Sequence, residues 1–240
     1  MIYENIISAP GKKFALLIDP DNYSVQSLIA TIYAAKDAEV NCILVGGSLV
    51  NTDIETKVDI IKRNTDIPVL LFPGSLHQLT NKADAILLLS LISGRNADFL
   101  IGNHVLAASF LKKSQLEIIP TGYILVKSEN MTSVEYISNT KPIPSNKVDI
   151  AVSTAIAGEL TGNKLIYLEA GSGASNPVCE DMIREVKRNI SIPLIVGGGM
   201  RTREDIIKTY KSGADIVVVG NAVENNLNLL QTLASCKNHF

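Results

Sequence analysis

Three glycine-rich segments in the last third of the chain have the composition of a phosphate site. They are EAGSG at Glu169–Gly173, GGG at Gly197–Gly199 and GN at Gly220–Asn221, and each ends a short apolar run. Glycine lets a backbone approach a ligand closely, and backbone N–H groups near helix N-termini bind phosphate oxygens. The pattern predicts a phosphate-binding site. The alternative is that these glycines only form tight turns.

A carboxylate and a hydroxyl at the ends of two earlier runs could bind a metal ion. Asp19 ends the run FALLID, and Ser48 follows the two glycines after CILV. Mg²⁺ takes oxygen ligands, and one or two carboxylates suffice when the substrate supplies phosphate oxygens. We predict that Asp19 and Ser48 bind Mg²⁺ together with the substrate. Asp21 is expected instead to cap the helix that begins near Ser24.

Glu169 is an acid at the end of a very apolar run, LIYLEAG. Burial raises the pKa of a carboxyl group and suits it to accept a proton near neutral pH; a structural salt bridge is the alternative. Tyr123 and Tyr167 lie in runs that end at the same face. Their hydroxyls either orient a ligand hydroxyl or belong to side chains that only fill the interior.

Eight short apolar runs must position these residues. They are continuous rather than alternating, which is typical of parallel strands buried on both faces. The runs are Phe14–Asp19, Cys42–Gly47, Pro68–Gly74, Ala85–Ile92, Ile119–Val126, Leu165–Gly171, Pro193–Gly199 and Ile216–Asn221. Helical patterns follow at Ser24–Ala38, Asp53–Arg63, Ala97–Lys112, Asp149–Leu160, Pro177–Asn189, Thr202–Ser212 and Val223–Ser235. This alternation, without a linker, predicts an α/β single-domain (β/α)8 TIM barrel over residues 1–240, with its site at the strand ends.

Two segments depart from a regular barrel. Ser75–Asp84 is too short for two loops and a helix, so the third helix is expected to be short or missing, with a thin wall there. Lys127–Lys147 is polar, contains two prolines and follows the fifth strand. We expect a long loop over the catalytic face, which is a candidate lid.

Composition excludes several classes of protein. The 240 residues are 46% hydrophobic and 19% charged, with a formal net charge of −2 and no basic block, so no nucleic-acid partner is expected. Three well-separated cysteines form no CxxC pair, which indicates a reducing compartment without disulfides or a zinc site. No signal peptide or transmembrane segment is apparent, so the expected location is cytoplasmic.

Six segments together resemble one family, the geranylgeranylglyceryl phosphate synthases, which also includes heptaprenylglyceryl phosphate synthases. The segments are LLIDPDN (Leu16–Asn22), LVGGS (Leu44–Ser48), GYILV (Gly122–Val126), YLEAGSGA (Tyr167–Ala174), VGGGMR (Val196–Arg201) and VVVGNAV (Val217–Val223). The resemblance covers essentially the whole chain. It implies a modified TIM barrel that lacks the regular third helix. It also implies Mg²⁺-dependent prenyl transfer from a polyprenyl diphosphate to the 3-hydroxyl of sn-glycerol 1-phosphate, forming an ether-lipid precursor.

The resemblance also assigns roles to residues. Asp19 and Ser48 match the family's Mg²⁺ ligands. The glycerol phosphate segments are matched by Tyr167, Leu168, Glu169, Ala170, Gly171, Ser172, Gly173, Gly198, Gly199, Gly220 and Asn221. For catalysis we expect Glu169 to accept the hydroxyl proton while Tyr123 and Tyr167 orient the substrate. The chain departs from the family at Asn22, where a basic residue is common. Binding of the diphosphate is therefore expected to depend more on Mg²⁺ and on other residues.

The resemblance implies further partners and leaves alternatives open. The family forms dimers and larger assemblies, so a homo-oligomer is expected. The prenyl tail needs an apolar groove, expected around LLFPG and ILLLSLI, and allows transient membrane contact.

Geranylgeranyl is the expected donor group and heptaprenyl the second choice; no residue that limits the length is identified. A metal-independent sugar-phosphate isomerase is one rival. A non-catalytic binding protein is another, although intact Asp19, Ser48 and Glu169 argue against it.

Overall fold

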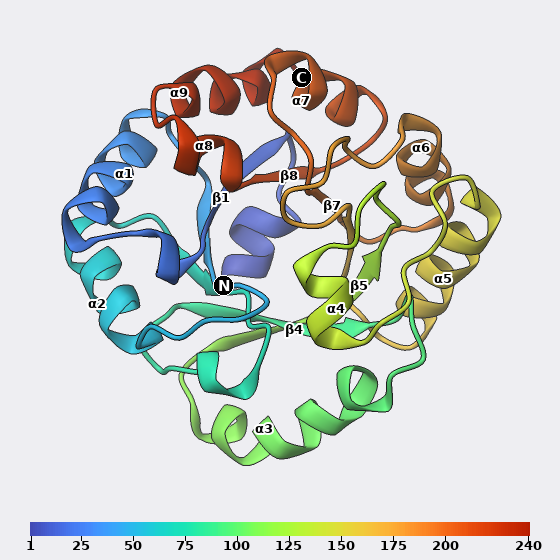
Figure 1. Ribbon diagram of the computed structural model, residues 1–240, viewed down its shortest axis with the longest axis horizontal. Coiled ribbons are helices and arrows are strands. Elements are labelled where there is room, and N and C mark those ends of the chain that lie inside the picture. Colours follow the sequence, from blue (N-terminus) through green and yellow to red (C-terminus); the bar gives the residue numbers. More distant parts are fainter.

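Eight parallel strands close into a barrel in chain order in the computed structural model, which describes residues 1–240 (Figure 1). The strands are β1 (Lys13–Ile18), β2 (Cys42–Val45), β3 (Val69–Leu71), β4 (Ala85–Leu91), β5 (Glu117–Leu125), β6 (Leu165–Glu169), β7 (Leu194–Gly197) and β8 (Ile216–Val219). β1 pairs with both β2 and β8, which closes the ring. The predicted TIM barrel is therefore confirmed.

Alternation along each strand separates two apolar cores. In β6, Ile166 and Leu168 belong to the core between sheet and helices, while Leu165 and Tyr167 belong to the core inside the barrel. Side chains two residues apart share a face of a strand. The face that carries Leu165 and Tyr167 therefore also brings Glu169 to the upper end of the barrel interior.

Helices surround the barrel as predicted, with some different limits, and a further short helix, α4, lies over the strands inside this ring (Figure 1). They are α1 (Val25–Asp37), α2 (Ile54–Asn64), α3 (Asn103–Lys113), α4 (Ser133–Ser138), α5 (Val148–Leu160), α6 (Glu180–Asn189), α7 (Arg203–Lys211), α8 (Asn221–Asn225) and α9 (Leu229–Ala234). The expected last helix is divided into α8 and α9. The expected sixth helix begins at Glu180, after Pro177. None of the helices combines the length and apolar character that crossing a membrane requires.

Side chains cap the first turns of α7 and α1. Thr202 caps α7 and forms a reciprocal capping box with Asp205, because each side chain accepts from the other residue's backbone N–H. The prediction that Asp21 caps α1 is wrong. Ser24 is the cap, since its hydroxyl accepts from Ser27 N, whereas Asp21 accepts from the backbone of Asn51 and Thr52. Asp21 lies three residues before the Ser24 cap, and its carboxylate instead accepts from the loop that precedes α2.

The third helix is missing, as predicted. A single 3₁₀ turn, η3 (Leu76–Gln78), is all that lies between β3 and β4. The predicted long loop after β5 is only partly a loop. It contains α4, and Ile143 pairs in parallel with Val126 beyond the end of β5. This pairing holds the segment down over the carboxyl ends of the strands.

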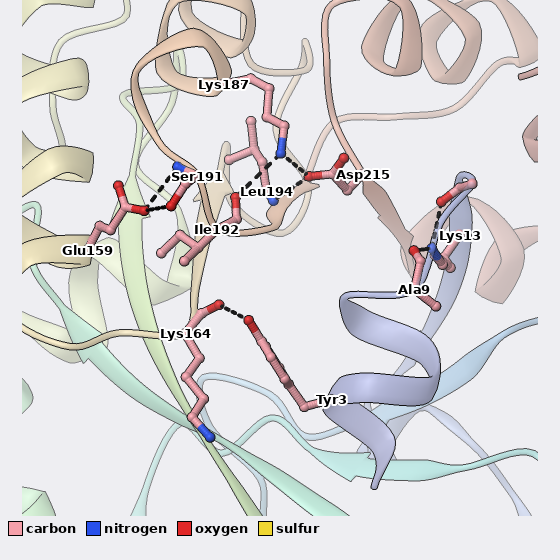
Figure 2. A network of polar contacts seen from close by, with 11 residues as sticks. Tyr3, Ala9, Lys13, Glu159, Lys164, Lys187, Ser191, Ile192, Leu194 and Asp215 are labelled. Atoms are coloured by element: carbon pink, nitrogen blue, oxygen red, sulfur yellow. Dashed lines mark hydrogen bonds and ion pairs between the residues drawn. The ribbon is translucent and has the colours of Figure 1, made fainter.

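Polar contacts link several elements at the opposite end of the barrel (Figure 2). The Lys187 ammonium contacts Asp215 at 2.6 Å, and the same carboxylate accepts from Leu194 N at 2.8 Å. The hydroxyl of Tyr3, the first residue of the N-terminal helical turn Tyr3–Ile7, donates to Lys164 O at 2.9 Å. Contacts at the amino ends of barrel strands contribute to stability rather than catalysis.

Candidate active site

A cavity of about 470 Å³ lies at the carboxyl ends of the strands. It brings together most of the residues predicted for the site: Asp19, Ser48, Tyr123, Tyr167, Glu169, Gly171, Ser172, Gly173, Gly198, Gly199, Gly220 and Asn221. It does not include Leu168 or Ala170. Both are buried in the core between sheet and helices, because they alternate with Tyr167 and Glu169 along the chain. Their side chains therefore do not line the cavity, and a role of their backbone in binding substrate stays a prediction.

The glycine segments present unpaired backbone donors to this cavity. Gly171, Gly173, Gly198 and Gly199 have φ angles of 99°, 78°, 83° and 71°, a region that favours glycine. The N–H groups of Ser172, Gly173, Gly198 and Gly199 make no hydrogen bond within the protein. Ser172 Oγ contacts Asn221 Oδ1 at 3.0 Å, which joins two of the segments. Several N–H groups converging on one place form an anion site.

Glu169 is a buried carboxyl group without a salt bridge. The residue is 6% exposed, and its Oε1 accepts from Gly171 N at 2.7 Å. Burial raises the pKa of Glu169 to about 7, although the Gly171 N–H and the Tyr167 hydroxyl lower it. The structural salt bridge considered for this residue is absent. A carboxyl group with a pKa near 7 is suited to accept and release a proton.

Three aromatic rings form a wall beside Glu169. The ring centroids of Tyr123 and Tyr167 are 5.2 Å apart, and Phe72, from the loop after β3, stacks on Tyr167 at 5.4 Å. The Tyr167 hydroxyl is buried close to Glu169 without forming a regular hydrogen bond. Burial raises the pKa of both tyrosines well above the ordinary value, so both hydroxyls keep their protons. Neutral hydroxyls here can orient a polar group near Glu169.

Asp19 and Ser48 follow the neighbouring strands β1 and β2 and line the same cavity. Asp19 Oδ1 accepts from Asp21 N at 3.1 Å and has no ion-pair partner. Burial raises the pKa of the Asp19 carboxyl group. Gly47 packs directly on this carboxylate, since a Cβ atom there would lie 2.7 Å from Asp19 Oδ2. Ser48 follows Gly47, so a carboxylate and a hydroxyl line the same corner of the cavity.

Several lining residues were not found from the sequence. Arg201 is the only cation among them, and its guanidinium donates to the carbonyls of Ala174 and Ser175. Glu224, in α8, accepts from Asn22 Nδ2 at 3.3 Å, which places a third carboxylate beside Asp19 and Glu169 in one cavity. Glu224 follows the GN segment by three residues, a helical spacing that could have indicated it.

An apolar cavity adjoins the polar one where the third helix is missing. Its lining includes Leu76, Leu79, Leu88, Phe99, Ala107 and Leu111, from η3, β4, the turn before α3 and α3 itself. Phe72, Tyr123 and Val134 line both cavities, as do Gly47 and Ser48. The apolar groove expected around β3 and β4 is therefore present. The two cavities meet at the aromatic wall and the Ser48 corner.

Comparisons with known proteins agree with these features. The model of the PcrB family matches residues 8–237. A geranylgeranylglyceryl phosphate synthase from Spirosoma linguale is 50% identical over 231 residues, which is 95% of this chain and 92% of that protein. A second, from Pyrococcus furiosus, is 43% identical over 212 residues, covering 88% of this chain and 84% of that one.

A solved structure is similar over the same range. It is (S)-3-O-geranylgeranylglyceryl phosphate synthase from Thermoplasma acidophilum in complex with sn-glycerol-1-phosphate, with a TM-score of 0.90 and 33% identity. The match covers 96% of this chain and 94% of that one. With a family model that spans nearly all of the sequence and relatives that cover nearly all of the chain, this protein belongs to the PcrB family.

Proposed function

We propose that the protein transfers a geranylgeranyl group from geranylgeranyl diphosphate to the 3-hydroxyl of sn-glycerol 1-phosphate. One observation carries this proposal: a polar cavity with an anion site and a buried acid is joined to an apolar cavity at an aromatic wall. The polar cavity suits a small phosphate ester, and the apolar lining of the second cavity suits an isoprenoid chain. The reacting atoms then meet near Tyr123 and Tyr167.

The acceptor is held by the glycine segments. The unpaired N–H groups of Ser172, Gly173, Gly198 and Gly199 donate to its phosphate, and the nearby Asn221 and Tyr167 side chains are available to its hydroxyl groups. Fixed donors of this kind orient a substrate without reorganisation during the reaction. The 3-hydroxyl then faces Glu169, whose carboxylate is the only buried proton acceptor in the cavity.

A divalent cation fits the corner formed by Asp19 and Ser48. Both supply hard oxygen atoms, and Asp19 has no cationic partner. The cavity has three carboxylates and one arginine, so two polyanionic substrates need added positive charge there. Mg²⁺ bound at this corner supplies charge neutralisation that makes diphosphate a better leaving group. Asp19 and Ser48 are the residues that would hold it.

The transfer is a balanced substitution at C1 of the donor. The bond from C1 to the diphosphate oxygen breaks, and the bond from C1 to the glycerol 3-oxygen forms. The hydroxyl proton passes to Glu169, which returns it to solvent when the products leave. Val134 of α4 lines both cavities, so an apolar side chain lies beside the place where C1 would react.

The pH dependence follows from the pKa of Glu169. Only the deprotonated carboxylate accepts a proton, and burial raises its pKa to about 7. We expect kcat/KM to rise tenfold per pH unit below that value and to level off above it. The measurement is initial rate against pH between about 5 and 9, at fixed free Mg²⁺. A flat profile through pH 7 would contradict the assignment of Glu169 as the base.

Substitution of Gly198 should weaken acceptor binding. Its φ of 83° disfavours alanine, and a Cβ atom there would collide with Glu169 Oε1 and lie 2.7 Å from Gly171 N. Gly173 is a matched control, because its φ is 78° but nothing lies within 4 Å of an added Cβ atom. We expect Gly198→Ala to lower the affinity for sn-glycerol 1-phosphate at least about tenfold more than Gly173→Ala. Equal losses of affinity in the two variants, measured by calorimetry, would show that backbone strain causes the loss and that the collision with Glu169 adds nothing.

The direct test uses labelled sn-glycerol 1-phosphate with four donors: geranyl, farnesyl, geranylgeranyl and heptaprenyl diphosphate. Mg²⁺-dependent ether formed fastest from the geranylgeranyl donor supports the proposal, and a heptaprenyl preference would correct the chain length. Turnover of a sugar phosphate in EDTA would favour the isomerase instead. Binding without any product would favour a non-catalytic protein. Cytoplasmic location and a homo-oligomer stay predictions.

A further inference from the structure

The turn that replaces the third helix contains a buried amide that the proposed mechanism does not use. Gln78 ends η3, and the residue is 1% exposed. An amide side chain loses its hydrogen bonds to water on burial, which is unfavourable unless partners in the protein replace them. The partners of Gln78 therefore indicate what it does.

Gln78 bonds to the backbones of two different strand-end loops. Its Oε1 accepts from Gly47 N and from Gly74 N, both at 3.2 Å, and its Nε2 donates to Gly47 O at 2.8 Å. Gly47 belongs to the loop after β2, and Gly74 to the loop after β3. One side chain thus fixes both polar groups of the Gly47 backbone and holds the two loops together.

These loops carry the two functional parts of the site. Gly47 packs on Asp19 and precedes Ser48, so its position sets the distance between the two oxygen ligands proposed for Mg²⁺. Gly74 packs on the same loop, because a Cβ atom there would lie 3.0 Å from Ser48 Cα. The loop after β3 also supplies Phe72, Pro73 and Gly74 to the lining of the apolar cavity.

We infer that Gln78 is a positioning residue that holds Ser48 beside Asp19 and ties this corner to the wall of the apolar cavity. The inference rests on the proposed function, because it concerns the donor's diphosphate and its Mg²⁺. A regular barrel helix would support both loops by packing. Here a three-residue turn stands in its place, so a single side chain supplies the support.

The test separates the donor end of the site from the acceptor end. Gln78→Met keeps the size of the side chain and removes all three hydrogen bonds. We expect the affinity for the thiodiphosphate analogue of geranylgeranyl diphosphate, measured by calorimetry with Mg²⁺, to fall about 10–100-fold, the range for residues that support metal ligands. The affinity for sn-glycerol 1-phosphate should stay unchanged, because its glycine segments follow β6, β7 and β8. Amide hydrogen exchange at Gly47 and Gly74 should become faster.

Two further variants keep the inference falsifiable. Thr80→Val is the matched control, since Thr80 is also 1% exposed and follows the same turn, but its hydroxyl donates to Glu55 at 3.0 Å and not to Gly47 or Gly74. It should leave both affinities unchanged. Gln78→Glu retains an oxygen acceptor for Gly47 N and Gly74 N but loses the donor to Gly47 O, and we expect a smaller loss of donor affinity than for Gln78→Met. If Gln78→Met does not fold, Gln78→Glu takes its place as the test of donor affinity.

The outcomes are distinct. Donor affinity equal to wild type in both Gln78 variants would overturn the inference while leaving the proposed function intact. Loss of acceptor and donor affinity by the same factor would show a merely structural role. If the wild-type protein neither binds the analogue nor forms ether product, the proposed function fails, and the role of Gln78 in it fails as well.

Discussion

Replacing Glu169 with glutamine is expected to slow ether formation about 10²–10⁴-fold, which is the usual contribution of a positioned general base. Glutamine has the same size, and its amide oxygen can still accept from Gly171 N as Oε1 does now at 2.7 Å. The site should therefore keep its shape and its affinity for sn-glycerol 1-phosphate. Single-turnover rates with both substrates saturating measure the effect on the chemical step alone.

Stability provides the control for this variant. Because the pKa of Glu169 is raised to about 7 in the folded protein, the folded state binds its proton more tightly than the unfolded chain. The stabilisation is present at low pH and is lost as pH rises from about 4.5 through about 7. Glu169→Gln removes this loss, so its free energy of unfolding at pH 8 should exceed that of wild type by up to about 3 kcal/mol.

These two results exclude the simplest rival explanation. A slower variant that is more stable at pH 8 has not lost activity by unfolding. Full turnover of Glu169→Gln would sink the proposed base. Unchanged stability with slow turnover would mean that the carboxyl group titrates near its ordinary pKa, and the expected pH profile would then shift to lower pH with it.

Replacing Asp19 with asparagine is the second large effect. Asparagine keeps an oxygen that can accept from Asp21 N, as Asp19 does at 3.1 Å, but it removes the negative charge. If Asp19 holds Mg²⁺, loss of that ligand forfeits several kcal/mol of charge stabilisation, or about 10²–10⁴ in rate at low Mg²⁺. High Mg²⁺ should restore part of the activity. The measurement is turnover as a function of free Mg²⁺ concentration.

A matched control separates charge from structure. Asp53 caps α2 by accepting from the backbone of Glu55 and Thr56, and it lies outside the cavity. Asp53→Asn should therefore leave the Mg²⁺ dependence unchanged. If Asp19→Asn keeps the wild-type rate and Mg²⁺ dependence, the cation does not bind at the corner formed by Asp19 and Ser48.

Local patterns were enough to predict the barrel and most of the residues that line the candidate site. A strand buried on both faces must be apolar throughout, so each of the eight runs was visible in the sequence itself. The missing helix was visible because ten residues cannot hold two loops and a helix. The candidate residues lie at the ends of these apolar runs, as Asp19, Ser48, Glu169 and the glycine segments do. The fold brings the carboxyl ends of all strands to one face.

Errors arose where a residue's partner is distant in the chain. Asp21 was expected to cap the adjacent helix but accepts from Asn51 and Thr52, some thirty residues away. Leu168 and Ala170 stay predictions as substrate-binding residues. Their side chains belong to the core between sheet and helices, so only their backbone is available to a ligand. Sequence reasoning missed Glu224 and Gln78 because neither lies at the end of an apolar run.

The sequence by itself determined the order of the elements, the face that carries the site and the chemical types gathered there, because these depend on composition and spacing along the chain. Only the tertiary structure decided which groups share a cavity, how deeply Glu169 is buried, and that Gln78 joins two loops. Burial and contact depend on packing between strands far apart in sequence. The raised pKa of Glu169 follows from that packing, and so does the position of the two cavities side by side with shared lining residues.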